Sequence, residues 1–142
     1  MQGKRNFSAK REAIYTLLSS TETHPSAEWI YEQLKPQIPD LSLGTVYRNL
    51  AVFKESGLIK SIGIFDGQER FDPNISQHSH FVCTCCFKII DIPKSKCLFM
   101  EQNVCQYVEN QCNVRIEDYS ITFYGLCEDC SENQAVAVQK DS

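Results

Sequence analysis

The sequence predicts an α+β fold built from two small domains, an N-terminal winged helix-turn-helix and a C-terminal α/β domain. Three observations predict it: helical spacing of apolar residues in the first 60 positions, an Asp-Gly turn directly after them, and paired cysteines in the second half. A chain of 142 residues suits one ordinary domain or two small ones. A domain of about 70 residues buries little core, so we expect a metal ion or a partner chain to stabilise it.

Three helices are predicted in this first part. Ser8 is the predicted N-cap of the first helix and Ser42 that of the third, because a serine hydroxyl accepts a hydrogen bond from the first turn. Gly57 is the predicted end of the third helix, since glycine readily takes the left-handed conformation found there. Apolar residues recur at intervals of three or four: Ala13, Ile14, Leu17 and Leu18; Ala27, Ile30, Tyr31 and Leu34; Leu43, Val46, Leu50 and Phe53.

Two short strands are predicted at residues 59–65 and 69–71. They flank Asp66-Gly67, a pair that favours a two-residue hairpin because both positions adopt positive φ. Three short helices followed by a hairpin make a winged helix-turn-helix, which we assign to residues 1–72. The composition changes at Asp72-Pro73-Asn74, and we expect a hinge at residues 73–75.

Residues 76–142 are predicted to form the α/β domain. Strands are expected at residues 81–83, 88–92 and 116–124. A helix is expected between the last two, with one apolar face: Cys97, Met100, Val104, Tyr107 and Val108. The tail after Ser131 is polar and is expected to fray.

The net charge of −4 is unevenly distributed. Residues 1–60 hold eight Lys and Arg against six Asp and Glu, whereas residues 61–142 hold six against twelve, so only the first part suits a polyanion. No run of about 18 apolar residues occurs, which argues against a membrane span. The first residues lead into no apolar segment of the kind that secretion signals have, so we expect a cytoplasmic protein. In that compartment, paired cysteines are typical of metal ligands or redox centres.

The cysteine pairs give the strongest indication of a metal site. Cys83 and Cys86 form one C-x-x-C pair, and Cys127 and Cys130 form another. Four thiolates at this spacing predict a closed, tetrahedral structural zinc site. We prefer Cys86 to its neighbour Cys85 for its spacing. Buried or redox-active cysteines are the alternative interpretation.

The histidines predict a second metal site. His78 and His80 stand two apart just before a strand, so both imidazoles can face one ion. Asp72 and Asp91 lie nearby in the sequence, and mixed imidazole and carboxylate ligation suits Fe(II), Mn(II) or Zn(II). Ordinary surface or core histidines are the alternative interpretation.

The third helix carries candidate DNA-binding residues. Thr45 and Arg48 point away from its apolar face, and we expect Tyr47 and Asn49 to flank them. Arg pairs with guanine or phosphate, Asn with adenine, and an aromatic ring with thymine methyls. An ordinary solvated helix face is the alternative, but the hairpin that follows the helix favours DNA binding.

Several motifs, taken in order, resemble the ferric uptake regulator family over about residues 6–131. They are His24-Pro-Ser-Ala, Thr45-Val-Tyr-Arg-Asn-Leu, Glu55-Ser-Gly-Leu, Arg70-Phe-Asp72, His78-x-His80, the first C-x-x-C, and Tyr124-Gly-Leu-Cys-x-x-Cys130. The resemblance implies a homodimer that binds an inverted-repeat operator in double-stranded DNA. It also implies a dimerisation domain that contains the zinc site, and a regulatory metal held between the two domains.

The resemblance adds His24 to the regulatory site and points to one branch of the family. It implies five ligands for Fe²⁺ or Mn²⁺: His24, Asp72, His78, His80 and Asp91. With aspartate at position 91, the chain resembles the peroxide-sensing repressors, which have aspartate at the matching position. Iron-uptake regulators usually have glutamate there. That branch implies oxidation of His24 or His78 by peroxide at the iron site, followed by derepression of oxidative-stress genes. An iron- or zinc-uptake repressor is the alternative within the family.

Two features depart from the family pattern. Phe87 stands where a glycine commonly follows the first cysteine pair, and Asp118 and Tyr119 stand where many members have histidines of an accessory metal site. We therefore expect no accessory site.

Two further classes of protein are alternatives. A catalytic iron or zinc centre is disfavoured because five protein ligands leave little room for a substrate. The sequence also shows no nucleophile–base pair, so we expect that the protein is not an enzyme. A thiol switch would use the remaining cysteines: Cys85, Cys97, Cys105 and Cys112. Small buried hydrophobes are the commoner explanation for Cys97 and Cys105.

Overall fold

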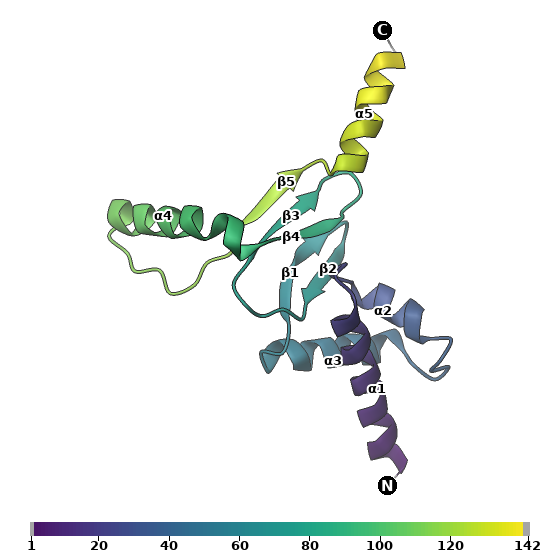
Figure 1. The fold of residues 1–142 in the computed structure, drawn as a ribbon. Helices are drawn as coiled ribbons and strands as arrows, with labels where there is room; N and C mark the ends of the chain where they lie inside the picture. The colour runs from purple at the N-terminus through teal and green to yellow at the C-terminus, as the bar shows by residue number, and fades with distance from the viewer. Residues whose placement is uncertain (1, 141–142) are drawn as a thin grey trace. The chain divides into compact units, whose positions relative to one another are not determined.

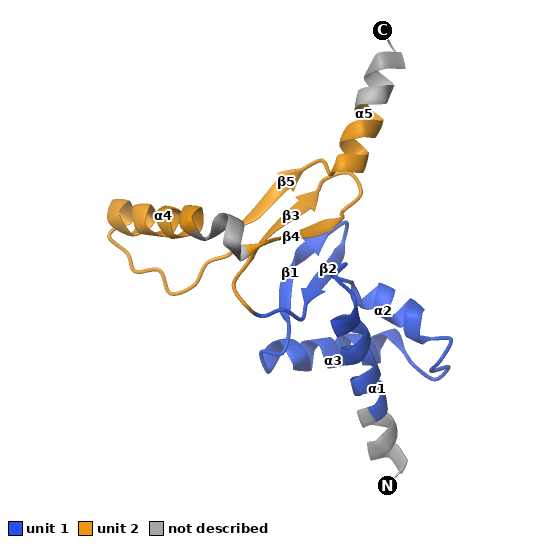
Figure 2. Cartoon of the chain, in the orientation of Figure 1, with its two compact units in different colours: residues 1–75 blue, residues 76–142 orange. Residues whose placement is uncertain are grey.

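The computed structural model describes the backbone of residues 2–140 and the side chains of residues 9–93 and 99–134. The chain divides into two compact units, residues 1–75 and 76–142, which are coloured separately in Figure 2. Mixed helix and strand in both units confirms the predicted α+β fold. The predicted contribution of Cys97 to a helix face lies outside the described side chains.

Unit 1 contains three helices followed by a hairpin. The helices are α1 (Gln2–Ser20), α2 (Ala27–Leu34) and α3 (Leu43–Glu55), and the strands are β1 (Lys60–Phe65) and β2 (Gln68–Asp72) (Figure 1). The predicted apolar positions supply most of its core: Ile14, Leu18, Ala27, Ile30, Leu34, Leu41, Val46, Leu50, Phe53, Ile59 and Phe71. The core therefore fixes α3 with one face inward and the other toward solvent.

The ends of α3 confirm the prediction from sequence. Ser42 is its N-cap, and the side chain accepts a hydrogen bond from the Thr45 amide. At the other end, Gly57 adopts φ +76°, and the amide of Leu58 donates to the Phe53 carbonyl. The Gly57 amide also donates a hydrogen bond to the Lys54 carbonyl, and the two hydrogen bonds together form a Schellman motif.

The hairpin is also confirmed. Phe65 pairs with Gln68, so Asp66 and Gly67 alone form the turn, with φ +52° and +73°. Two consecutive positive φ values match the twist of the flanking strands. The register shifts between Ser61 and Gly63, which places a bulge near the base of β1.

Unit 2 contains a three-stranded sheet and two helices. Its elements are β3 (Ser79–Cys83), β4 (Ile89–Ile92), α4 (Lys94–Cys112), β5 (Thr122–Gly125) and α5 (Glu128–Lys140). The strand order is β4-β3-β5, with β3 antiparallel to β4 and parallel to β5 (Figure 1). Among the described side chains of unit 2, few apolar ones are buried, and several large ones on α4 and β5 are exposed: Phe99, Met100, Val104, Tyr107, Phe123 and Tyr124.

Three predicted boundaries are wrong. Helix α1 begins at Gln2, so Ser8 lies inside the helix and is not its N-cap. The last strand spans Thr122–Gly125 only, since the polar residues before Thr122 form an irregular connection. The tail after Ser131 continues α5 instead of fraying.

Candidate metal centres and nucleic-acid interface

The four cysteines of the two C-x-x-C pairs meet in unit 2. Their Sγ atoms all lie within 4.8 Å of one another, and the group contains Cys86 rather than Cys85. The sheet brings them together: β3 ends at Cys83 with Gly125 of β5 beside it, and the Thr84 amide donates to the Gly125 carbonyl at 2.8 Å. Pairing of β3 and β5 thus holds two cysteine pairs that are far apart in the sequence within reach of one ion.

The backbone around Cys83 favours its thiolate form. Hydrogen bonds from the amides of Cys86 and Cys127 lower the pKa of Cys83 to about 6, against the usual 9.0. The Cys127 amide lies 3.4 Å from the Cys83 Sγ. In contrast, a hydrogen bond shared with the Cys127 thiol raises the pKa of Cys130. Since the thiolate is the metal ligand, the cluster has the donor set and the amide environment of a tetrahedral zinc site.

A second group of donors in unit 2 lies on β4 and at the start of β3. The Asp91 Oδ1 is 3.3 Å from the His78 Nε2 and 3.2 Å from the His80 Nε2. His80 and Asp91 are direct partners across the β3–β4 pair, which explains their proximity. The His78 Nδ1 lies 2.7 Å from the Ser76 carbonyl. Donation from Nδ1 to that carbonyl leaves Nε2 with a lone pair for a metal, as metal-binding histidines usually do.

Unit 1 holds the other two predicted ligands. The His24 Nε2 lies 3.3 Å from the Asp72 Oδ2, and both side chains are almost fully buried. The Asp72 Oδ1 accepts a hydrogen bond from the Asn74 amide at 2.8 Å, which fixes the carboxylate. His24 follows α1 by four residues and Asp72 ends β2, so only tertiary folding brings the two together. A buried carboxylate with a buried imidazole beside it is chemistry that suits a divalent cation.

The predicted DNA-binding residues of α3 fall into two groups. Tyr47 and Arg48 are exposed, and Thr45 is half-buried beside them. The Arg48 Nη2 donates to the Thr45 Oγ1 at 3.1 Å, so the guanidinium lies along the outer face of the helix. The Tyr47 hydroxyl donates to Glu28 of α2, and this hydrogen bond raises the pKa of Tyr47. Glu28 had no sequence pattern that marked it, because its partner is 19 residues away.

The structure corrects the prediction for Asn49. Its side chain is 0% exposed and is buried against α1. The Asn49 Oδ1 accepts from the Arg11 Nε at 3.0 Å, and its Nδ2 donates to the Thr45 carbonyl at 2.9 Å. An amide with both ends engaged inside the domain cannot pair with adenine, so we assign Asn49 a structural role.

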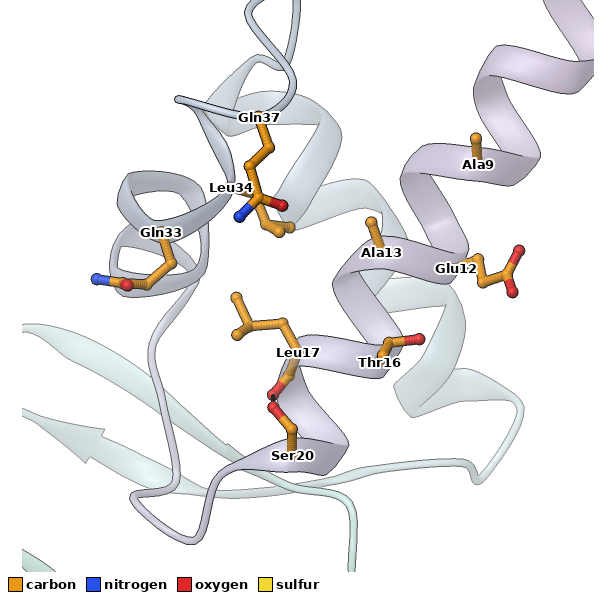
Figure 3. Close-up of a pocket in the computed structure, with 9 residues that line it drawn as sticks. All are labelled: Ala9, Glu12, Ala13, Thr16, Leu17, Ser20, Gln33, Leu34 and Gln37. Atoms are coloured by element: carbon orange, nitrogen blue, oxygen red, sulfur yellow. Dashed lines mark hydrogen bonds between the residues drawn. The ribbon is translucent and has the colours of Figure 1, made fainter.

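A shallow pocket of about 500 Å³ lies between α1 and α2, away from these residues (Figure 3). Figure 3 shows Leu17 and Leu34 on its walls, with polar side chains such as Glu12 and Gln37 around them. It contains no predicted metal ligand or DNA-binding residue. Nothing in the pocket resembles a catalytic group pair.

Among the residues that the structure describes, no helix combines the length and apolar character necessary for a membrane span.

Comparison with known proteins places the chain among metal-responsive regulators. Residues 3–124 match the model of the ferric uptake regulator family. The chain is 36% identical over 123 residues to the peroxide-responsive repressor PerR of Staphylococcus saprophyticus. The aligned residues cover 87% of this chain and 80% of that protein. It is 33% identical over the same length to the PerR of Staphylococcus aureus strain USA300, with the same coverage of each chain.

Solved structures show the same fold. The peroxide stress regulator of Campylobacter jejuni is similar with a TM-score of 0.72 and 25% identity, covering 91% of this chain and 94% of that one. The iron-containing ferric uptake regulator of Francisella tularensis gives a TM-score of 0.73 and 26% identity, covering 85% and 90%.

Proposed function

This chain belongs to the ferric uptake regulator family, and on that premise we propose that it is a metal-dependent transcriptional repressor that senses hydrogen peroxide. The observation that carries this proposal is the donor set: His24 and Asp72 in unit 1, with His78, His80 and Asp91 in unit 2. All five donors are nitrogen or oxygen, which suits Fe²⁺ or Mn²⁺ better than the thiolates do.

One ion held by ligands from both units would couple metal binding to DNA binding. The exposed face of α3, with Tyr47 and Arg48, is the surface we assign to the operator, and β1–β2 is the wing. In this proposal, one divalent cation takes ligands from both units. Metal binding therefore selects one arrangement of the DNA-binding unit, which is how a small ion can control affinity for DNA.

A homodimer is supported by the surface of unit 2. Phe99, Tyr107 and Tyr124 are at least 63% exposed, which is unusual for large apolar side chains on a monomer. A second copy that covers α4 and β5 would bury them, and the twofold axis would match an inverted-repeat operator. We assign zinc on Cys83, Cys86, Cys127 and Cys130 to the stability of this unit.

The ligands themselves are the proposed targets of peroxide. When bound, ferrous iron would supply the electron that splits hydrogen peroxide; overall, one imidazole C–H becomes C–OH, the peroxide is reduced by two electrons, and its second oxygen leaves as water. His24 and His78 are the imidazoles proposed to take up the oxygen. His24 is 3% exposed and His78 is held by the Ser76 carbonyl, so neither can turn away from the reaction. An oxidised imidazole is a poorer ligand, and loss of the metal would release the operator.

The test compares the iron-loaded and manganese-loaded protein after treatment with micromolar peroxide. We expect the iron form to gain the mass of one oxygen atom on a peptide that contains His24 or His78, and to lose operator binding at the same rate. The manganese form should do neither. Oxygen on cysteines with earlier loss of zinc would instead make the thiols the sensor.

An iron-uptake repressor is the second candidate, because the family match alone includes it. The Asp91→Glu variant separates the two. If the first proposal is correct, this variant retains metal-dependent operator binding but reacts more slowly with peroxide than the wild type. Absence of any oxidation in the iron-loaded wild type would favour the uptake regulator.

A further inference from the structure

The backbone of His24 has an unusual conformation. Its φ is +54°, in the left-handed region that residues with a side chain seldom adopt. His24 lies in the short connection between α1 and α2, and its side chain is buried beside Asp72. Such a backbone persists only where its surroundings hold it, and this position holds a proposed metal ligand.

Arg70 of β2 holds this connection from the outside. Its Nε donates to the His24 carbonyl, and its Nη2 donates to the Thr23 carbonyl at 2.7 Å. One guanidinium therefore binds two consecutive carbonyls, including that of the left-handed residue. Its planar fork suits two acceptors at once, which a single ammonium cannot match. The guanidinium is partly buried, and this loss of solvent lowers the pKa of Arg70.

The main chain of β2 adds a third contact to the same connection. The Phe71 amide donates to the Pro25 carbonyl at 3.1 Å. This amide faces the outer edge of the hairpin, which is a two-stranded sheet in the part of the chain that the structure describes. Arg70 and Asp72 stand two apart on β2, so their side chains leave the same face of the strand. Strand β2 thus supplies the proposed ligand Asp72. It also supplies Arg70, which holds the backbone of the proposed ligand His24.

We propose that Arg70 is a positioning residue for the regulatory metal site: it holds His24 in its left-handed conformation and joins that ligand to the wing strand. The inference rests on the proposed function, because it assigns a metal-binding role to His24. It also implies that His24 and the wing move as one piece when the metal binds. The signal would then reach the wing through Arg70 as well as through the ligand Asp72.

The test measures Mn²⁺ affinity of the zinc-loaded protein in four forms: wild type, Arg70→Ala, His24→Ala and the double variant. We expect Arg70→Ala to weaken Mn²⁺ binding about tenfold, the scale typical of groups that orient a ligand, while zinc content stays unchanged. The double variant should bind Mn²⁺ no more weakly than His24→Ala alone, since Arg70 acts through that residue. Additive losses would overturn the inference.

A metal-independent readout separates this inference from the proposed function. In the zinc-loaded protein without Mn²⁺, Arg70→Ala should speed hydrogen exchange at the Phe71 amide, and unchanged exchange would overturn the role of Arg70. If His24→Ala leaves Mn²⁺ affinity intact, the proposed ligand set is wrong and the positioning role falls with it. If only Arg70→Ala leaves the affinity intact, the ligand set stands and Arg70 does not position it.

Two further variants serve as controls. Lys54→Ala removes a cation whose partner is Glu69, the neighbour of Arg70 on β2, at 3.0 Å. It should leave Mn²⁺ affinity and Phe71 exchange unchanged, and an effect equal to that of Arg70→Ala would overturn the inference. Arg70→Lys keeps the charge and should recover only part of the affinity. It also provides the test if Arg70→Ala does not fold.

Discussion

Adjacent residues on one turn of α3 differ completely in their surroundings. Arg48 lies exposed along the outer face, whereas Asn49 is buried and bound to Arg11 and to the Thr45 carbonyl. The helical period places Asn49 at the border of the apolar face. Whether a border residue is buried depends on what covers it, and here the cover is α1. The sequence could not predict this contact because Arg11 is 38 residues away.

This difference predicts opposite effects for two alanine substitutions. Arg48→Ala should weaken operator binding by about 1–3 kcal/mol, the value of one base contact, with little change in stability. Asn49→Ala should lower the free energy of unfolding by about 1–3 kcal/mol, because it removes two side-chain hydrogen bonds inside the domain, one from Arg11 and one to the Thr45 carbonyl.

Footprinting and denaturant unfolding on both variants measure the two effects. An Arg48→Ala variant with unchanged footprinting would move the recognition surface away from this face of α3. An Asn49→Ala variant as stable as the wild type, yet weak in DNA binding, would restore Asn49 as a base contact.

The sequence marks the candidate metal ligands more clearly than the candidate DNA contacts. Cysteine pairs at C-x-x-C spacing and histidines at His-x-His spacing carry their own geometry, because one turn or one extended segment aims both side chains the same way. His24 has no such neighbour. Its proximity to Asp72 arises only from the packing of the α1–α2 connection on β2, and resemblance to a family was needed to identify it.

At the scale of helices and strands, ends with specific chemistry were predicted well. Ser42 and Gly57 mark the ends of α3, and Asp66-Gly67 marks the hairpin, because each position needs a hydroxyl acceptor or a positive φ. Ser8 has the same residue type as Ser42 but lies inside α1. A capping residue permits a helix to start and does not require it, so the length of α1 could not be fixed from the sequence.

The C-terminal end of α3 gives a prediction at this scale. Gly57→Ala should lower the free energy of unfolding by about 1 kcal/mol, because a side chain at φ +76° is strained although no atom lies within 4 Å of the new Cβ. Gly57→Asn is the matched control and should cost less, since asparagine tolerates this region. Denaturant unfolding of both variants measures the difference, and equal stability of Gly57→Ala and wild type would show that the end of α3 relaxes without cost.

At the scale of the whole molecule, the two units are stabilised differently. Unit 1 has a continuous apolar core from three helices and the hairpin. Unit 2 buries few apolar side chains and gathers four cysteines at one end of its sheet. The length of the chain could predict that a domain of this size needs a metal ion or a partner chain. It could not predict which strands the metal would join, since that depends on the parallel pairing of β3 with β5.

Loss of zinc should therefore unfold unit 2 selectively. Cys83→Ser or Cys130→Ser should abolish zinc binding and the dimer, because structural zinc contributes on the order of 10 kcal/mol to small modules. Cys85→Ser is the matched control and should retain zinc, dimer and melting temperature. Metal analysis, sedimentation and thermal unfolding provide the measurements. A zinc-free Cys83→Ser protein that melts cooperatively as a dimer would contradict the assignment.

The parallel pairing of β3 with β5 has a consequence for how the protein is made. On the ribosome, every strand and helix of unit 1 can find its partners once residue 75 has emerged. The central strand β3 emerges soon afterwards, but its parallel neighbour and the second cysteine pair follow only after α4 and the long connection. Domains generally fold as units during synthesis, from the N-terminus onward. By that rule, we expect unit 1, with the proposed DNA-binding surface, to fold first, and zinc to bind only after Cys130 has left the exit tunnel.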